Sequence, residues 1–239
     1  MPRYPVKQPQ VSSAGSGGVA AVDRALLLLA SFRRGDDSLS LGELAARSGL
    51  VKSTALRLLA SLVHFGLVRK LDDGRYALGP EVARLQSIYT ASFSLEGLVV
   101  PVLRSLVKRT RESAIYHVRQ GDARLCLYRV DSPQPLRDHV QVGDLLPLDR
   151  GAGGRVILAF SGAKGALYDR IRRDRVAALV GDRSKDLAGI AAAVFKPGGE
   201  VAGAITLTMP ASRFDARFVP FVRAAAERVT RGLGGTFPS

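Results

Sequence analysis

The chain contains 239 residues, of which 46% are hydrophobic and 23% charged, and 35 Lys and Arg against 21 Asp and Glu give it a formal net charge of +14. This length allows one or two domains with hydrophobic cores, and the single cysteine excludes an intramolecular disulfide and a multi-cysteine metal site. The apolar run of residues 25–30 is far shorter than the ~20 residues that cross a bilayer. We therefore expect a cytoplasmic protein without a membrane segment, and an anionic partner, with nucleic acid favoured over a membrane surface.

The chain opens with a predicted disordered arm and a helix. Residues 1–18 are rich in Pro, Gly, Ser and Gln and contain little that a core could bury. Residues 19–32 then show apolar residues at helical spacing. The apolar stripe of this helix is predicted at Val22, Leu26, Leu29 and Ala30.

Two further helices follow with a very short connection. Ser40 and Glu43 have the spacing of a capping box, and Gly49 supplies the left-handed residue that ends the first of the two helices. The second helix begins at residue 52 or 53 and runs to about residue 64. Two helices joined by such a brief glycine-containing turn form a helix-turn-helix.

A β-hairpin completes this N-terminal domain. Residues 67–71 and 76–78 are strand-like, and a turn of two aspartates, a glycine and Arg75 separates them. Residues 19–79 are therefore predicted to form a winged helix-turn-helix. Residues 80–92 are predicted to form a linker helix, with Val82, Leu85 and Ile88 on one stripe.

Residues 93–239 are predicted to form a second, α+β domain, because runs of strands lie between helices. The expected elements are a helix at 98–110, strands at 113–119, 123–131 and 136–142, a helix at 155–160 after a glycine-rich turn, a hairpin at 190–195 and 201–209, and a final helix at 218–233.

The second helix of the helix-turn-helix presents four polar residues near its start, namely Lys52, Ser53, Thr54 and Arg57. The first residues of a recognition helix meet base edges and phosphates. Arg57 suits a two-pronged contact to guanine, and the two hydroxyls suit phosphates or bases. Arg75 at the tip of the wing suits a minor groove, and Ser40 completes the predicted DNA-binding set. The alternative interpretation is a solvated polar face.

Several stretches of the chain resemble the IclR family of transcriptional regulators. They are residues 22–26, 44–59, 76–79, 98–106, 142–155 and 188–192, with Pro210 and Arg213. Together they span about residues 19–234. The resemblance implies a winged-helix DNA-binding domain, a linker helix and a GAF-like effector-binding domain. It also implies a homodimer or dimer of dimers that binds double-stranded operator DNA and responds to a small organic effector, often a carboxylic or aromatic acid, with no cofactor.

Carried over by position, the resemblance places effector-binding residues at Leu146, Gly151, Ala152, Gly153, Asp182, Gly189, Ile190, Thr206 and Thr208. Strand alternation puts the two threonines on one face, where they line a cavity or meet solvent. The glycine-rich turn at 151–154 leaves backbone N–H groups for an anion such as a carboxylate, or is a tight turn that needs small residues. Gly189 and Thr206 replace cysteine or serine of some members, so the resemblance does not identify the effector.

An enzyme with a regulatory winged helix and a DNA-binding protein without an effector are the alternatives. The sequence has no Gly-x-Ser-x-Gly elbow and no phosphate-binding loop. The three histidines are not at metal-ligand spacing, and Cys126 in an apolar strand is expected to be inert. Four carboxylates have no evident partner, namely Glu112, Asp131, Asp138 and Asp144. We expect no catalytic and no metal-binding residue; turnover of a bound compound would indicate an enzyme.

Overall fold

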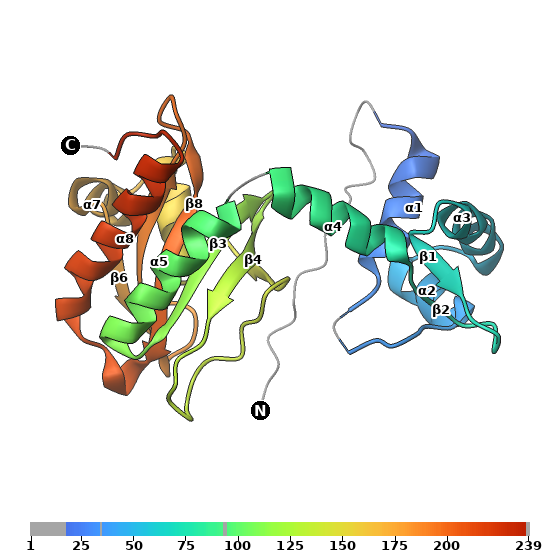
Figure 1. Ribbon diagram of the computed structural model, residues 1–239, viewed down its shortest axis with the longest axis horizontal. Helices are drawn as coiled ribbons and strands as arrows, with labels where there is room; N and C mark the ends of the chain where they lie inside the picture. The colour runs from blue at the N-terminus through green and yellow to red at the C-terminus, as the bar shows by residue number, and fades with distance from the viewer. Residues whose placement is uncertain (1–17, 34, 93–94, 238–239) are drawn as a thin grey trace. The chain divides into compact units, whose positions relative to one another are not determined.

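The computed structural model describes residues 18–33, 35–92 and 95–237 (Figure 1). The chain divides into two compact units, with the boundary at residues 93 and 94. The predicted arm lies outside the described residues except for its last residue. Within the described ranges, no helix is long and apolar enough to span a bilayer.

The N-terminal unit is the predicted winged helix-turn-helix. It contains α1 (Ala20–Ala30), α2 (Leu41–Ser48), α3 (Lys52–His64) and an antiparallel hairpin of β1 (Val68–Lys70) and β2 (Tyr76–Leu78). The capping box at the start of α2 is formed, and Gly49 ends α2 with φ +72°. A compact core holds the three helices and the wing together, with Leu28, Leu44, Leu59, Val68 and Tyr76 among its buried members.

The predicted apolar face of α1 is wrong. Leu28 is the fully buried residue of the helix, and Ala25, Leu29 and Phe32 pack beside it. Val22 and Leu26 are 54% and 55% exposed. Four consecutive leucines cover more than half of a helix circumference, so the spacing alone did not decide which side meets α2 and α3.

The predicted linker helix is present as α4 (Pro80–Ser92). Its start packs on the winged helix, because the Glu81 N–H donates to the Gly66 carbonyl at 3.1 Å. Leu85 and Ile88 remain 46% and 49% exposed, so the predicted stripe is not buried within the unit.

The C-terminal unit is an α+β fold built on one antiparallel sheet with the order β5-β4-β3-β8-β7-β6. The strands are β3 (Ser113–Gln120), β4 (Ala123–Val130), β5 (Leu145–Pro147), β6 (Ala177–Val180), β7 (Leu187–Phe195) and β8 (Val201–Pro210). The helices are α5 (Leu95–Thr110), α6 (Ala152–Phe160), α7 (Ala166–Asp174) and α8 (Val219–Gly232), with short 3₁₀ turns η1 (Ala211–Arg213) and η2 (Ala216–Phe218). Helices α5 and α8 cover one face of the sheet, and α6 and α7 pack on the other (Figure 1).

The predicted strand at 136–142 is an irregular loop, and the edge strand is β5 instead. The alternation that suggested a strand is real, since Asp138 and Val140 point inward while Leu136 and Val142 are exposed. However, side-chain contacts, and not backbone hydrogen bonds to a neighbouring strand, keep Asp138 and Val140 facing inward. Val140 packs on Ile115 and Cys126, and Asp138 forms ion pairs. Side-chain burial with period two therefore arose without ladder hydrogen bonds. Helix α7 and strand β6 were not predicted.

Candidate nucleic-acid interface and ligand pocket

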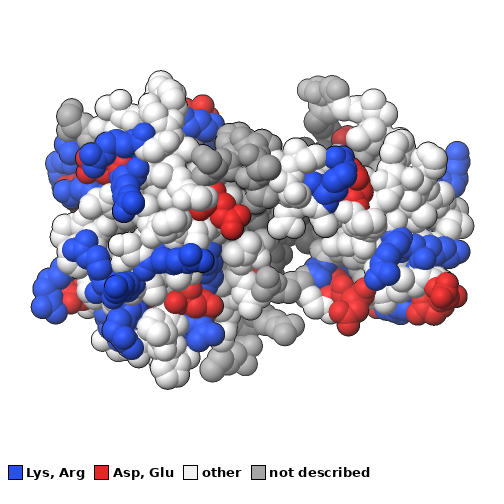
Figure 2. Space-filling view, in the orientation of Figure 1, with Lys and Arg blue, Asp and Glu red and all other residues white. Residues whose placement is uncertain are grey.

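The start of α3 presents a group of free polar side chains. Lys52, Ser53 and Arg57 are exposed and Thr54 is half-buried. None of the four makes a hydrogen bond or ion pair with another described residue. Arg69 and Lys70 of β1 are exposed as well, and Figure 2 shows basic side chains over this part of the unit. The surface has the donors and the charge that a phosphate backbone requires.

Ser40 and Arg75 are placed differently from this group. The Ser40 hydroxyl donates to the Glu43 carboxylate at 2.8 Å and accepts from the Glu43 N–H at 3.2 Å. The Arg75 guanidinium donates to the hydroxyl and the carbonyl of Ser38, both at 2.8 Å, and to Glu43 at 3.3 Å. Arg75 therefore does not extend freely from the wing, whose turn carries the exposed Asp72 and Asp73. The two residues brace the start of α2, and a minor-groove contact by Arg75 would first have to break these bonds.

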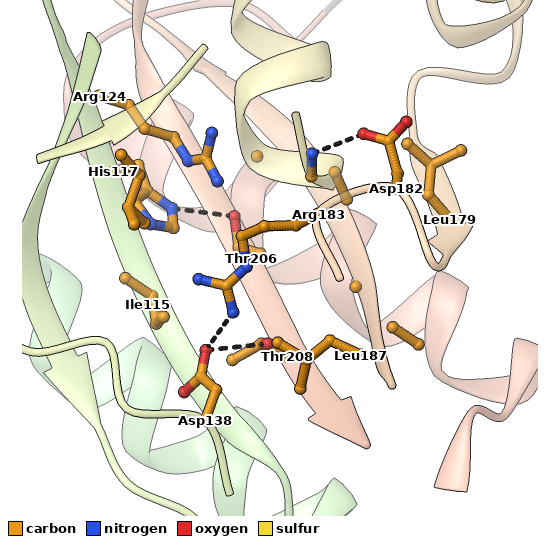
Figure 3. Close-up of a pocket in the computed structure, with 16 residues that line it drawn as sticks. Ile115, His117, Arg124, Asp138, Leu179, Asp182, Arg183, Leu187, Thr206 and Thr208 are labelled. Atoms are coloured by element: carbon orange, nitrogen blue, oxygen red, sulfur yellow. Dashed lines mark hydrogen bonds and ion pairs between the residues drawn. The ribbon is translucent and has the colours of Figure 1, made fainter. Parts of the chain in front are cut away.

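A pocket lies between the sheet of the C-terminal unit and the start of α6, with about 410 Å³ of empty space, part of it open to solvent (Figure 3). The following residues of the predicted effector set line it: Leu146, Gly151, Ala152, Gly153, Asp182, Gly189, Thr206 and Thr208. Both threonines are buried, so their stripe faces the cavity rather than solvent.

Ile190 does not line the pocket. Its side chain is buried in the opposite core, which α5 and α8 cover. Successive strand residues point to opposite faces, so a strand that directs Gly189 toward the pocket must direct Ile190 away from it.

The sequence prediction missed several lining residues, namely Ile115, His117, Arg124, Asp138, Leu179, Arg183, Leu187 and Ala188. Two of them could have been predicted from the sequence. Ile115 and His117 are two residues apart and therefore lie on the same face of β3, which pairs with β8, the strand that carries Thr206 and Thr208. Arg124 comes from β4, Asp138 from the 131–144 loop and Arg183 from the segment after β6. Nothing in the local sequence joins these three positions.

His117 is a buried, neutral imidazole on the pocket wall. Its Nδ1 lies 3.2 Å from the Thr206 hydroxyl, and its buried Nε2 has no hydrogen-bond partner. Burial lowers the pKa of His117 well below 6.5, and the nearby charges of Arg124, Arg183 and Arg129 lower it further. The ring therefore offers the pocket one polar nitrogen without charge.

Ion pairs fix the lower and right-hand walls in Figure 3. Asp138 accepts from Arg183 at 2.8 Å and from the Thr208 hydroxyl at 3.2 Å, and its other oxygen pairs with Arg129 at 2.7 Å. Asp182 accepts from the Gly151 N–H at 2.6 Å and from Arg155 at 3.1 and 3.2 Å. The first free N–H of the glycine-rich turn is thus occupied by a carboxylate of the protein itself.

The carboxylates without evident partners in the sequence do have contacts in the structure. Arg213 binds buried Glu112 through two bonds of 2.6 and 2.8 Å, and Arg129 pairs with both Asp131 and Asp138. The fourth, Asp144, accepts from the Gln141 N–H at 2.7 Å. The Arg129 pairs join the 131–144 loop to β4, the Arg213 pair joins η1 to the residue before β3, and the Asp144 contact lies within the loop, so each contact has a structural role.

The described residues contain no activated thiol and no group of three metal-ligating side chains. Cys126 is fully buried, and burial raises the pKa of its thiol to about 12, so the thiolate is not populated near neutral pH. The pocket is therefore equipped for polar recognition rather than for nucleophilic chemistry by this cysteine.

The low pKa of His117 makes the stability of the C-terminal unit depend on pH. In the unfolded chain a histidine takes up a proton below pH of about 6.5, whereas buried His117 does not. We therefore expect the free energy of unfolding to fall as the pH drops below this value, by up to about 1.4 kcal/mol per pH unit from this residue.

His117→Gln should remove that part of the slope between pH 6.5 and 5.5, and His139→Gln, at an exposed position, should leave it unchanged. Urea unfolding followed by circular dichroism measures both. An unchanged slope in His117→Gln would show that this histidine titrates normally in the folded protein.

Comparison with known proteins supports the interpretation of both units. The IclR helix-turn-helix domain matches residues 21–72, and the C-terminal domain of the bacterial transcriptional regulator IclR matches residues 88–168. An HTH-type transcriptional regulator of Mycobacterium tuberculosis, Rv1719, is 29% identical over 84% of this chain and 86% of its own length. The transcriptional repressor IclR of Escherichia coli is also 29% identical, over 73% of this chain and 61% of the repressor.

Solved structures agree with the fold. An IclR regulator from Silicibacter sp. TM1040 superposes with a TM-score of 0.80 at 26% identity, over 91% of this chain and 98% of the other. An IclR homologue from Microbacterium hydrocarbonoxydans, solved with 4-hydroxybenzoate, gives 0.78 at 20% identity, over 90% and 99%. Since the family's two domains match both halves in order, the chain belongs to the IclR family of transcriptional regulators.

Proposed function

We propose that this regulator binds a specific operator through α3 and that a small organic acid in the C-terminal pocket modulates that binding in the cytoplasm. The observation that carries the proposal is that the chain has a winged helix with free donors at the start of α3 and a separate α+β unit with a polar pocket. Each unit has its own core, so one can read DNA while the other binds a ligand.

In this proposal Arg57 binds a guanine in the major groove, and Lys52, Ser53 and Thr54 contact phosphates or neighbouring bases. The support is their exposure and freedom from internal partners, since a side chain without internal bonds loses none when it meets DNA. Ser40 and Arg75, also predicted to touch DNA, are proposed to act by holding the start of α2 beside the groove.

Arg57→Ala should weaken binding to the specific operator by about 5- to 100-fold, the value of one good base contact, and relax the base preference at one position. Fluorescence anisotropy at fixed salt measures the affinity. Arg84→Ala is the matched control, because Arg84 is bound to Glu81 on α4. Wild-type affinity and base preference in Arg57→Ala would refute the assignment of α3 as the reading helix.

We propose a carboxylic or aromatic acid as the effector. Two observations support it: the pocket lies at the N-terminus of α6, and arginines surround it. The Microbacterium relative binds 4-hydroxybenzoate, a compound of this class. An enzyme role has no comparable support, and we expect no turnover of the bound acid.

Gly153→Leu should abolish the effector response and leave operator binding within about twofold of wild type. The pocket and the DNA-binding surface lie in different units, so blocking the pocket affects operator binding only when effector is present. A Cβ on Gly153 would lie 2.6 Å from the Thr206 hydroxyl and 3.0 Å from His117 Nδ1, so a larger side chain must fill the pocket.

Operator binding is measured with and without a panel of organic acids. Gly97→Leu, on α5 with nothing near its Cβ position, is the control. A normal response in Gly153→Leu would exclude this pocket as the effector site.

We propose that the protein acts as a homodimer or a dimer of dimers, with an effector changing how two winged helices fit two half-sites. Exposed apolar side chains support self-association, since Val19 before α1, Val22 and Leu26 on α1 and Leu85 on α4 remain largely exposed in the single chain.

Leu26→Glu should shift the sedimentation coefficient toward the monomer and reduce operator affinity at least tenfold, because each monomer would hold only one half-site. Leu136→Glu, at an exposed position in the other unit, should change neither. A monomeric wild-type protein that binds operator at full affinity would contradict the proposal.

A further inference from the structure

Arg124 is a buried arginine on β4 that forms no direct ion pair with a carboxylate of the described residues. It is only 3% exposed and lines the pocket. Its Nη1 donates to the carbonyls of Pro147 and, at 2.7 Å, Arg150. Its Nε is buried without a hydrogen-bond partner, and its Nη2 makes no bond to any described residue. Three of the five N–H groups of the guanidinium therefore make no hydrogen bond with the described residues.

Three neighbouring arginines each pair directly with a carboxylate. Arg155 pairs with Asp182, and Arg129 and Arg183 share Asp138. Burial and the nearby charge of Arg183 lower the pKa of Arg124 to about 9, and the more distant charges of Asp182 and Asp149 offset only part of this effect, so the group stays charged at neutral pH. A buried charge without a directly bound carboxylate is unfavourable. A bound anion would remove that penalty.

The glycine-rich turn is shaped around this guanidinium. A Cβ on Gly151 would lie 3.1 Å from Nη2, and a Cβ on Gly154 would collide with Nη1 and with the Leu148 carbonyl. The glycines thus let Arg124 lie against the first turn of α6. The first N–H groups of a helix have no intrahelical partner, and here Asp182 takes only that of Gly151.

His117 supplies a second, uncharged polar group in the same pocket. Its Nε2 is also buried without a partner, and Figure 3 shows its ring and the Arg124 guanidinium entering the pocket from the same side. The pocket therefore combines one cation that is not directly ion-paired with one neutral nitrogen.

We propose that Arg124 binds the anionic group of the effector at the start of α6 and thereby selects compounds with a single negative charge, with His117 meeting a neutral polar group of the same molecule. This inference rests on the proposed effector function and identifies the residue that binds the negatively charged group of the effector. The competing role of Arg124 is a clamp that only ties the 147–150 segment to β4.

The test uses the full chain and acid–amide pairs: benzoate and benzamide, 4-hydroxybenzoate and 4-hydroxybenzamide, pyruvate and pyruvamide, with terephthalate as a dianion. Isothermal titration should show at least one monoacid bound at least tenfold more tightly than its amide and more tightly than terephthalate. In Arg124→Gln that acid should lose about 10- to 100-fold in affinity, so that acid and amide bind alike.

Two variants separate anion binding from clamping. Arg124→Lys keeps the charge and can donate to both carbonyls, but it lacks the planar fork. It should keep the wild-type Tm and lose most of the preference for acid over amide, whereas a clamp would keep both properties. Arg119→Gln removes an exposed arginine at the facing position of β3 and should preserve the preference.

Equal affinity for acids and amides, absence of binding by every acid tested, or an intact acid preference in Arg124→Gln would each overturn the inference. Operator binding measured in parallel separates it from the proposed function. If a neutral compound alters operator binding, the effector function stands and the role of Arg124 fails. If acids bind through Arg124 without changing operator affinity, the anion site stands and the effector coupling fails.

Discussion

Alternation along β3, β7 and β8 places neighbouring side chains in two separate environments. Ile190 and Leu207 enter the apolar core under α5 and α8, while Gly189 and Thr206 face the pocket. Because the start of α6 covers this face of the sheet, its polar side chains line a pocket. The approach of α6 depends on small residues, since a Cβ on Gly189 would lie 3.3 Å from the Ala152 methyl group. The pocket forms where the polar and small residues on one face of β3, β7 and β8 lie opposite the glycine-rich start of α6.

Charge is used differently in the two units. At the start of α3, exposed cations and hydroxyls have no internal partners and remain available to a polyanion. In the C-terminal unit many arginines form ion pairs with carboxylates of the same unit, and Arg213 binds Glu112 through two hydrogen bonds. Residues 93–239 carry more than half of the net charge of +14. The formal charge therefore suggested the class of partner, and the free side chains indicate where that partner binds.

The ion pairs between arginines and carboxylates also determine the polarity of the pocket. The carboxylate of Asp138 pairs with Arg129, and that of Asp182 pairs with Arg155. The neutral form of His117 adds no charge to the pocket. Arg124 remains as a cation held only by carbonyls. Ordered contacts to backbone oxygens position it, and burial strengthens its attraction for an anion. The contacts that position Arg124 therefore leave it without a directly bound carboxylate.

The sequence by itself determined the helix-turn-helix, the wing, the linker helix and most strands. Their signals are local: Glu43 follows Ser40 by three residues, and Gly49 takes the left-handed conformation that other residues avoid. Resemblance also located half of the lining residues, because their spacing follows the family pattern.

Only the tertiary structure decided which face of α1 is buried, that residues 136–142 form a loop, and that Arg124, Asp138 and Arg183 meet in one pocket. These three residues come from a strand, a loop and a segment after another strand. Their contacts depend on packing and ion pairs between positions up to 59 residues apart, for which a local pattern carries no information.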